Sequence, residues 1–452
     1  MRSFRTAVAA LAAAGFASAA PAAAPAQGDW VGTWGYVTAP LPPGPAAPAP
    51  APVVPVAPPA AIPLGPIPAP VAATPSAPRP AFPAPLLDNP GGVPVDVAAT
   101  DLTNVTVRQV VRVSAGGKQL RLRISNEGGA DALTLGAVHV GEAGPDGAVI
   151  AGTDRAVTFD GRPGVTAPAG SPVLSDPIDL PTKALDRLYI SVYAPGTIPG
   201  RAQRALFQYV AGVGGDQTAA AQLPSARLMR VQPFVTLVET RTAAPASVVV
   251  TLGDSITEGA TSTSNAFRSW PDRLAERLVG SNWAVVNAGI SGNRLLRYGA
   301  GPTALARLDR DVLSVPGVKA IILMEAINDI GRGFAPTGAR EAVTLEALEA
   351  ADKQIIARAH EHGIRVIGAT LTPYGGASYA SPEGEAVRGA YNQWIKTAGA
   401  FDGVIDFAPA VALASNPLTF DPQYNIRDHL HPNDAGYKAM SDAIDLKVLT
   451  GR

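Results

Sequence analysis

The pattern of apolar and polar residues changes near Pro245. After this point, short fully apolar runs alternate with longer segments that have helical periodicity. This pattern is typical of parallel strands that are buried on both faces and joined by helices. Strands are expected at Val248–Leu252, Trp283–Asn287, Val318–Met324, Arg365–Leu371 and Val404–Phe407, and helices at Ser269–Val279, Thr303–Leu313, Glu341–Glu361, Pro382–Ala398 and Asn433–Ile444.

Residues 89–245 have a different pattern, in which short alternating runs are separated by glycine, proline and aspartate turns. Such spacing is typical of an antiparallel β-sandwich. Two runs, Val107–Val113 and Leu120–Ile124, flank Gly116-Gly117 and are expected to form a half-buried hairpin. Further strands are expected at Arg187–Tyr193, at Phe234–Val238 and, as the first strand of this domain, at Trp30–Trp34 within residues 27–38.

The first 88 residues carry two other kinds of segment. Arg2 and Arg5 precede the apolar run Ala7–Ala20, and small-residue cleavage patterns follow, which predicts a secretory signal over residues 1–26. Residues 39–88 are rich in proline and alanine, so an extended polyproline II linker or insertion is expected there. The mature protein is therefore predicted to be secreted or periplasmic, with no integral membrane segment.

The amino-acid composition excludes several classes of function. With 452 residues the chain is long enough for two folded domains. A formal net charge of -1 and a charged fraction of 16% give no reason to expect a nucleic acid partner. The chain has no cysteine, which excludes disulfides, thiol nucleophiles and thiolate metal sites.

The candidate chemistry begins with Gly253-Asp254-Ser255-Ile256, which directly follows the apolar run Val248–Leu252. Ser255 is thus expected at the carboxyl end of a buried strand, where open α/β sheets place their ligands. A serine hydroxyl needs a base and a group that orients the base. Of the five histidines, His431 occupies a loop before Pro432, and Asp428 lies three residues earlier. Ser255 is the expected nucleophile, His431 the general base and acid, and Asp428 its orienting partner.

Three alternatives remain open at this stage. Asp428 and His431 could form a structural turn pair. Asp428, His429, His431 and Asp434 could instead bind a metal ion, although no other histidine is near to complete the set. Ser291 is a weaker alternative nucleophile, because it lacks the strand-to-helix context.

Acyl transfer also needs hydrogen-bond donors for the developing oxyanion. Gly292 follows a predicted strand in a glycine-rich segment, where the backbone can approach a ligand closely. Asn328 follows the next strand and offers a side-chain amide, and the backbone N–H of Ser255 is a third candidate. Taken singly, Gly292 fits an ordinary turn and Asn328 an Asx-turn equally well.

The chain contains four ordered blocks: Gly253-Asp254-Ser255-Ile256, the segment around Gly292, Ala326-Ile327-Asn328-Asp329 and Asp428-x-x-His431. In order and spacing, they resemble the sequence blocks of the SGNH (GDSL-type) esterase/lipase family. The resemblance covers residues 246–452 and implies a flavodoxin-like three-layer α/β/α hydrolase domain. It also implies a triad of Ser255, Asp428 and His431, an oxyanion hole of Ser255, Gly292 and Asn328, and no cofactor or metal. Ala326 stands where the family pattern has glycine, and Ile256 where it has leucine.

The β-rich region more loosely resembles a domain that often precedes secreted members of this family, whose Trp-x-x-x-Trp start is similar to Trp30–Trp34. The sequence therefore predicts a secreted serine esterase that acts on a small-molecule or polysaccharide ester, with short acyl groups such as acetyl on carbohydrate favoured. One alternative is a lipase or lysophospholipase that uses the Pro/Ala-rich segment as an interfacial anchor. Another is a carbohydrate-binding protein without catalysis.

Overall fold

The computed structural model of the chain describes residues 29–37, 102–145, 147–198, 210–223, 226–229, 234–336, 341 and 343–450. The expected signal segment 1–26 and the Pro/Ala-rich segment 39–88 lie outside these residues. Among the helices of the described part, none is both long and apolar enough to cross a bilayer.

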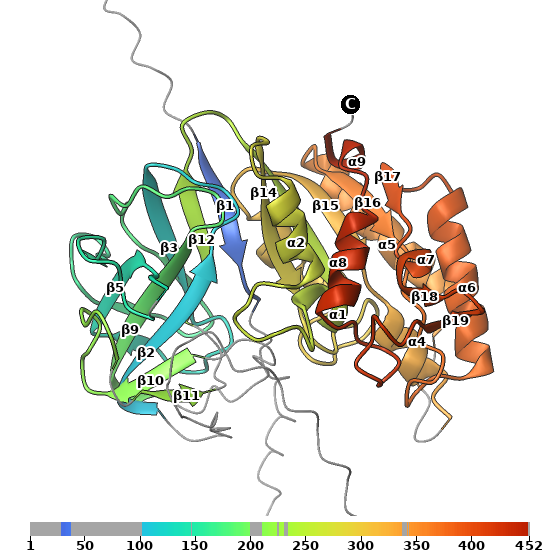
Figure 1. Ribbon diagram of the computed structural model, residues 1–452, viewed down its shortest axis with the longest axis horizontal. Helices are drawn as coiled ribbons and strands as arrows, with labels where there is room; N and C mark the ends of the chain where they lie inside the picture. Colours follow the sequence, from blue (N-terminus) through green and yellow to red (C-terminus); the bar gives the residue numbers. More distant parts are fainter. Residues whose placement is uncertain are drawn as a thin grey trace, which may run out of the picture.

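Two antiparallel sheets form the part of the structure that precedes Arg241 (Figure 1). Within the described residues, one sheet contains, in spatial order, β1 (Trp30–Gly35), β12 (Val235–Arg241), β3 (Gln119–Ser125) and β8 (Pro172–Leu174). The other contains β11 (Arg227–Met229), β10 (Val210–Gly214), β2 (Leu102–Arg112), β9 (Arg187–Ile198), β5 (Ala137–Glu142) and β6 (Arg155–Ala156). β4 (Leu133–Leu135) and β7 (Val165–Ala167) form a separate two-stranded antiparallel sheet.

Alternate residues of both sheets point into a single hydrophobic core, for example Val107 and Val111 of β2 and Leu120 and Leu122 of β3. This arrangement confirms the predicted β-sandwich. Trp30–Trp34 is also a strand, as expected, and pairs with β12.

The predicted hairpin of Val107–Val113 with Leu120–Ile124 is wrong. β2 pairs with β9 and β10, whereas β3 pairs with β12 and β8, so the two segments lie in different sheets. Their apolar faces meet across the core rather than side by side. Alternation indicates which residues share a face of a strand, but it carries no information about which strand supplies the hydrogen bonds.

After Arg241 the described chain forms one five-stranded parallel sheet with the order β14 (Trp283–Gly289), β13 (Ser247–Gly253), β15 (Val318–Met324), β16 (Arg365–Ala369) and β17 (Gly403–Ile405). In order of sequence this is 2-1-3-4-5, the flavodoxin-like order. The predicted α/β fold class is therefore confirmed. β13 and β15 are almost entirely buried, which explains their continuous apolar sequence.

Helices cover both faces of this sheet (Figure 1). α2 (Trp270–Arg277) packs against α8 (Asp434–Asp442), which also contacts α7 (Ala408–Val411). α5 (Leu345–Glu361) packs against α3 (Ala304–Leu308) and α6 (Pro382–Thr397). The shorter elements are α1 (Ser255–Glu258), the π-helical turn η1 (Asp309–Leu313), α4 (Ile327–Gly333), α9 (Lys447–Thr450) and the strand pair β18 (Ala412–Leu413) and β19 (Asn416–Phe420).

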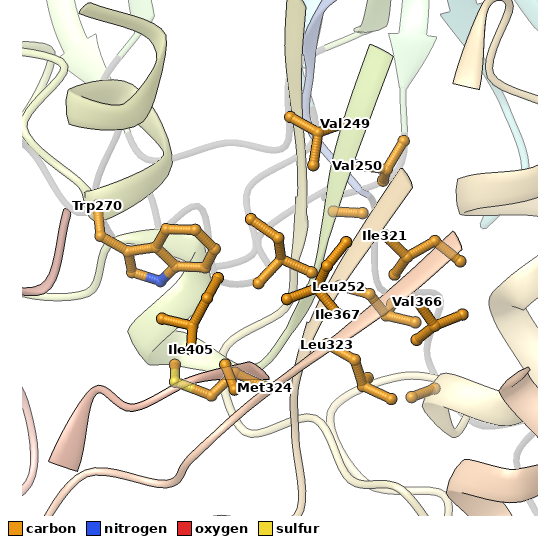
Figure 2. Close-up of a cluster of buried hydrophobic side chains, with 14 of the residues drawn as sticks. Val249, Val250, Leu252, Trp270, Ile321, Leu323, Met324, Val366, Ile367 and Ile405 are labelled. Atoms are coloured by element: carbon orange, nitrogen blue, oxygen red, sulfur yellow. The ribbon is translucent and has the colours of Figure 1, made fainter. Parts of the chain in front are cut away.

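The core of the parallel sheet combines aliphatic strand residues with aromatic residues from the covering layers (Figure 2). Figure 2 shows the indole of Trp270 beside strand residues that include Leu252 and Ile405. The Trp270 ring also lies 5.3 Å, between centroids, from Phe407. This packing holds α2 against the sheet next to the strand that carries Gly253.

The sandwich and the parallel sheet meet along β1 and β14 (Figure 1). Gly32 N donates to Pro316 O at 2.9 Å, and a Cβ at Gly32 would lie only 2.7 Å from Cγ1 of Val315. Ser114 Oγ lies 2.9 Å from both N and O of Val285, so a side chain of the sandwich satisfies backbone groups on the edge strand β14.

Candidate active site

Ser255 is the first residue of α1, directly after the strand β13 and the N-cap Asp254. Asp254 Oδ1 accepts the N–H of Ile256 at 2.8 Å, which fixes the strand-to-helix turn. Gly253 is required there, because a Cβ would collide with the carbonyl oxygen of Met324 on the adjacent β15. The turn holds Ser255 at the carboxyl end of β13, and only 6% of the residue is exposed.

The hydroxyl of Ser255 lies 2.9 Å from Nε2 of His431. Nδ1 of the same ring lies 2.6 Å from Oδ2 of Asp428. Burial opposes ionisation of Asp428, but the hydrogen bond and charge of His431 and the backbone N–H groups of His431 and Leu430 lower its pKa to about 2. An ionised Asp428 accepts the Nδ1–H proton, so Nε2 is left unprotonated and able to accept the serine proton. The structure thus brings the three predicted residues together in one hydrogen-bonded chain.

The loop that carries Asp428 and His431 is held by a residue that the sequence analysis missed. Asn425 Oδ1 accepts the N–H of Arg427 at 2.6 Å and that of His429 at 3.1 Å, and its Nδ2 donates to His431 O at 3.0 Å. Arg427 and His429 have φ values of 76° and 60°, which a tight loop of this kind imposes. An asparagine three residues before an aspartate is too common a pattern to have indicated this role.

The predicted oxyanion donors follow the strands on either side of β13. Gly253 lies in register with Gly289 of β14 and with Met324 of β15, so the loops after all three strands leave the same edge of the sheet. Gly292 has a φ of 75°, in the left-handed region that favours glycine. Within the described residues, the N–H groups of Ser255 and Gly292 donate to no protein acceptor.

Asn328 lies in the first turn of α4, and its Nδ2 donates to Asn293 O at 3.0 Å. That bond uses one amide hydrogen and leaves the second for a ligand. Asp329 reinforces the link between the two loops, because its carboxylate accepts the N–H groups of Leu295 and Leu296 at 2.8 Å and 3.0 Å. Ala326 is the left-handed N-cap of α4 with a φ of 101°, which explains why the family pattern has glycine at this position.

Two further residues near these loops had no sequence signal. Tyr379 donates from its hydroxyl to Asn328 Oδ1 at 3.4 Å and so fixes which end of the amide faces Asn293. Arg307 of α3 is buried and donates to Gly253 O at 2.9 Å, Ala288 O at 2.6 Å and Asn293 Oδ1 at 2.8 Å. Arg307 therefore links the ends of β13 and β14 and the segment after Gly292. From the sequence alone, an arginine in a helix would be expected at the solvent-exposed surface.

A group of buried carboxyls lies beneath the nucleophile. Burial raises the pKa of Asp254 to about 6 and that of Asp329 to about 6. Burial, with the repulsion of Asp254, raises the pKa of Glu325 well above its ordinary value. Burial thus opposes the ionisation of these carboxyls, whereas Asp428 is the carboxylate in hydrogen-bond contact with His431.

The other candidates take different positions. Ser291 N donates to Glu258 Oε2 at 2.6 Å, and its hydroxyl has no hydrogen-bond partner among the described residues, so it has no base. Asp434 accepts hydrogen bonds from Thr263 rather than joining Asp428 and His431. In the described part of the chain, no group of three or more histidines or carboxylates is placed to hold a metal ion.

The sequence of the α/β part of the chain matches a known protein family. Residues 251–439 match the sequence profile of the GDSL-like Lipase/Acylhydrolase family. No curated protein matches the chain in sequence.

Solved structures with a similar fold are each related at low identity. An acetyl xylan esterase variant from Geobacillus stearothermophilus is 22% identical with a TM-score of 0.36, over 45% of this chain and 95% of that one. A GDSL-like lipase from Bacteroides thetaiotaomicron is 18% identical with a TM-score of 0.34, over 46% of this chain and 89% of that one. A member of the lipolytic protein G-D-S-L family from Veillonella parvula is 20% identical with a TM-score of 0.33, over 44% and 96%.

The α/β/α fold and the serine–histidine–aspartate chain define a serine hydrolase. The α/β domain belongs to the GDSL-like lipase/acylhydrolase family, as its four motifs indicate, and the protein is a carboxylic ester hydrolase of this type.

Proposed function

We propose that the protein is an exported serine esterase that hydrolyses short-chain carboxylic esters, such as acetyl groups on carbohydrate, through an acyl-enzyme. The observation that carries the proposal is the continuous chain from Ser255 Oγ to His431 Nε2 at 2.9 Å and from His431 Nδ1 to Asp428 at 2.6 Å. A hydroxyl, a base and an ionised orienting group in hydrogen-bond contact are the requirements of nucleophilic acyl transfer.

In acylation, Ser255 Oγ attacks the ester carbonyl carbon while its proton passes to Nε2 of His431. The carbonyl oxygen becomes an oxyanion, which the N–H groups of Ser255 and Gly292 and the free amide hydrogen of Asn328 are available to bind. Asp428 stabilises the imidazolium that forms. The tetrahedral intermediate then breaks its bond to the alcohol oxygen, and His431 returns the proton to the leaving alcohol.

Deacylation uses the same groups in reverse. Water attacks the acyl-serine carbonyl and gives a proton to His431, the same donors bind the second oxyanion, and the proton returns to Ser255 Oγ as the carboxylic acid leaves.

The preference for short acyl groups rests on the residues that follow the strand ends around Ser255. Among them, Gly292 and Asn293 after β14 and Asn328 and Asp329 after β15 are polar or glycine. The apolar residues of the same two segments, Ile290, Ala326 and Ile327, are no more than 4% exposed and offer an acyl chain little surface. A long acyl chain gains about 0.8 kcal/mol for each CH2 that it buries, and it needs apolar surface to do so. An acetyl group needs almost none.

Hydrolysis of p-nitrophenyl acetate and p-nitrophenyl palmitate by the full-length mature chain tests substrate class. The acetate should have the higher kcat/KM, and a preference for palmitate would favour the lipase alternative. Labelling by a fluorophosphonate should occur in the wild type and not in Ser255→Ala, whereas a non-catalytic binding protein would not be labelled at all. Mass spectrometry of the exported chain, which should begin near Ala20 or Gln27, tests export.

A further inference from the structure

The loop of residues 259–269, which follows the nucleophile helix, connects α1 to α2. It begins at the left-handed C-cap Gly259 and ends at Ser269, the N-cap of α2. Three of its residues that are not glycine have positive φ values, namely Thr261 at 69°, Asn265 at 56° and Phe267 at 56°. Such backbone persists only where surrounding contacts hold it, and it is often found in segments with a functional role.

On one side this loop is anchored to the β-sandwich by Phe267. Its ring packs with Val110, Tyr189 and Ala211, which lie on the face of the six-stranded sheet that points away from the sandwich core, and only 6% of Phe267 is exposed. Two guanidinium groups flank the ring, that of Arg112 at 5.3 Å and that of Arg187 at 5.9 Å from its centroid. Burial and cation–π attraction together make Phe267 a firm attachment.

On its other side the loop holds the segment that carries His431. Thr261 Oγ1 lies 2.7 Å from the carbonyl oxygen of Pro432, the residue after His431, and its hydroxyl proton is shared between this acceptor and the carbonyl oxygen of Ala260. Thr263 donates to both carboxylate oxygens of Asp434, from N at 2.8 Å and from Oγ1 at 2.7 Å. The anchored phenylalanine and the two threonines lie within seven residues of one another along the chain, Thr261 to Phe267.

These contacts matter because the histidine segment is otherwise bonded to itself. Asn425 and Asp428 fix His431 relative to Asp428, but these bonds all lie within residues 425–431. Among the described residues, the segment 423–434 also bonds to its chain neighbours Asp421 and residues 435–437. The hydrogen bonds that reach it from more distant parts of the chain come from Ser255, Thr261 and Thr263. The 259–269 loop therefore supplies most of its distant hydrogen bonds.

We propose that the 259–269 loop is a brace through which the β-sandwich positions His431 against Ser255, with Phe267 and Thr261 as positioning residues. The sandwich then contributes to turnover without touching substrate. A displacement of about 1 Å in a reacting group can cost about 10²-fold in rate, so small movements of Pro432 are enough to matter. The proposal rests on the esterase function proposed above.

Substitutions at the two ends of the brace test it by steady-state kinetics on p-nitrophenyl acetate. Phe267→Ala removes the anchor, and Thr261→Val removes the hydroxyl but keeps the shape of the side chain. Each should lower kcat by about 10- to 100-fold and change KM by less than about 3-fold. Phe267→Tyr and Thr261→Ser keep the ring and the hydroxyl and should restore kcat to within about 3-fold of the wild type.

The matched control is Phe159→Ala. Phe159 is also 6% exposed, but it lies in the core of the sandwich away from the loop. It should lower the melting temperature without lowering kcat below that temperature. If Phe159→Ala reduced kcat as much as Phe267→Ala, general destabilisation would explain the effect and the brace would be disproved.

Coupling between the ends gives a second test. If both residues act through one path, the double variant Phe267→Ala/Thr261→Val should lose little more kcat than either single variant. Fully multiplicative losses would contradict a single brace.

Failure of the brace can be told apart from failure of the proposed function. If the wild type neither hydrolyses esters nor reacts with a fluorophosphonate, the function is wrong, and the brace is then judged by NMR of the imidazole groups. The chain has five histidines, so the His431 signals can be assigned by substitution. Phe267→Ala should shift the His431 signals and leave those of His360 unchanged, and unchanged His431 signals would overturn the brace.

Discussion

Nε2 of His431 lies 2.9 Å from Oγ of Ser255, although the two residues are 176 positions apart in the chain. The contact joins the end of the first strand of the parallel sheet to a loop beyond the last one. Because Asp428 accepts from Nδ1 on the other side of the ring at 2.6 Å, the neutral imidazole presents an unprotonated Nε2 to the serine hydroxyl.

Removing any member of the hydrogen-bonded series Ser255, His431 and Asp428 should abolish most of the esterase activity. Ser255→Ala and His431→Ala should each lower kcat by at least about 10³-fold, and Asp428→Asn by about 10⁴-fold because the amide favours the wrong histidine tautomer. Circular dichroism and the melting temperature should show intact folding. Near-normal turnover by Asp428→Asn would mean that another group orients His431.

The oxyanion role of Asn328 gives a separate kinetic signature. Asn328→Asp keeps the size of the side chain but replaces the amide donor, so kcat should fall by about 10²- to 10³-fold while KM changes little. Gln393→Glu, at an exposed position on α6, is the matched control and should be silent. A change confined to KM would place Asn328 in ground-state binding instead.

Arg307 should act on both stability and rate. Its three hydrogen bonds to Gly253, Ala288 and Asn293 would be lost in Arg307→Met, which leaves buried acceptors without donors. The free energy of unfolding should fall by about 3 kcal/mol, and kcat should fall because the Ser255 and Gly292 segments lose their common support. Arg310→Met removes a neighbouring arginine that donates to Asp311 but not to the strand ends, so it should leave kcat unchanged. Equal kcat losses in both variants would rule out this role.

The parallel sheet was predictable because its strands are buried on both faces. The strand predicted at Val318–Met324 has the observed bounds, and the strand predicted at Val248–Leu252 is one residue shorter at each end than the observed strand. The observed boundary of an element differs from the predicted one where a side chain caps the element. The helix expected from Glu341 begins at Leu345, because Thr344 accepts the N–H of Ala347 at 3.2 Å and caps it.

The structural features that the sequence could not predict depend on tertiary contacts. The helix expected over Thr303–Leu313 divides into α3 and a π-helical turn. The roles of Arg307, Asn425 and Phe267 depend on backbone groups or sheet faces far away in the chain, and no local pattern encodes them. Ser255, Gly292, Asn328, Asp428 and His431 could be chosen because their chemistry and their place after a predicted strand or within a loop are both visible in sequence.

Asp352 should make stability depend on pH. The carboxyl is buried on α5 and accepts the Tyr391 hydroxyl at 2.5 Å. Burial raises its pKa from 3.8 to about 7, although the Tyr391 hydrogen bond opposes the shift. Between these two pH values the folded protein binds more protons than the unfolded chain, so the contribution of Asp352 to the free energy of unfolding decreases as pH rises through this window.

Asp352→Asn, which cannot ionise, should therefore lose less stability than the wild type between pH 4.5 and pH 7.5. The difference should be on the order of 3 kcal/mol, measured by urea unfolding at the two pH values. Asp442→Asn is the control, because its side chain is 52% exposed and pairs with Lys438 at the surface. Parallel pH profiles for Asp352→Asn and the wild type would show that Asp352 is already ionised in the folded protein.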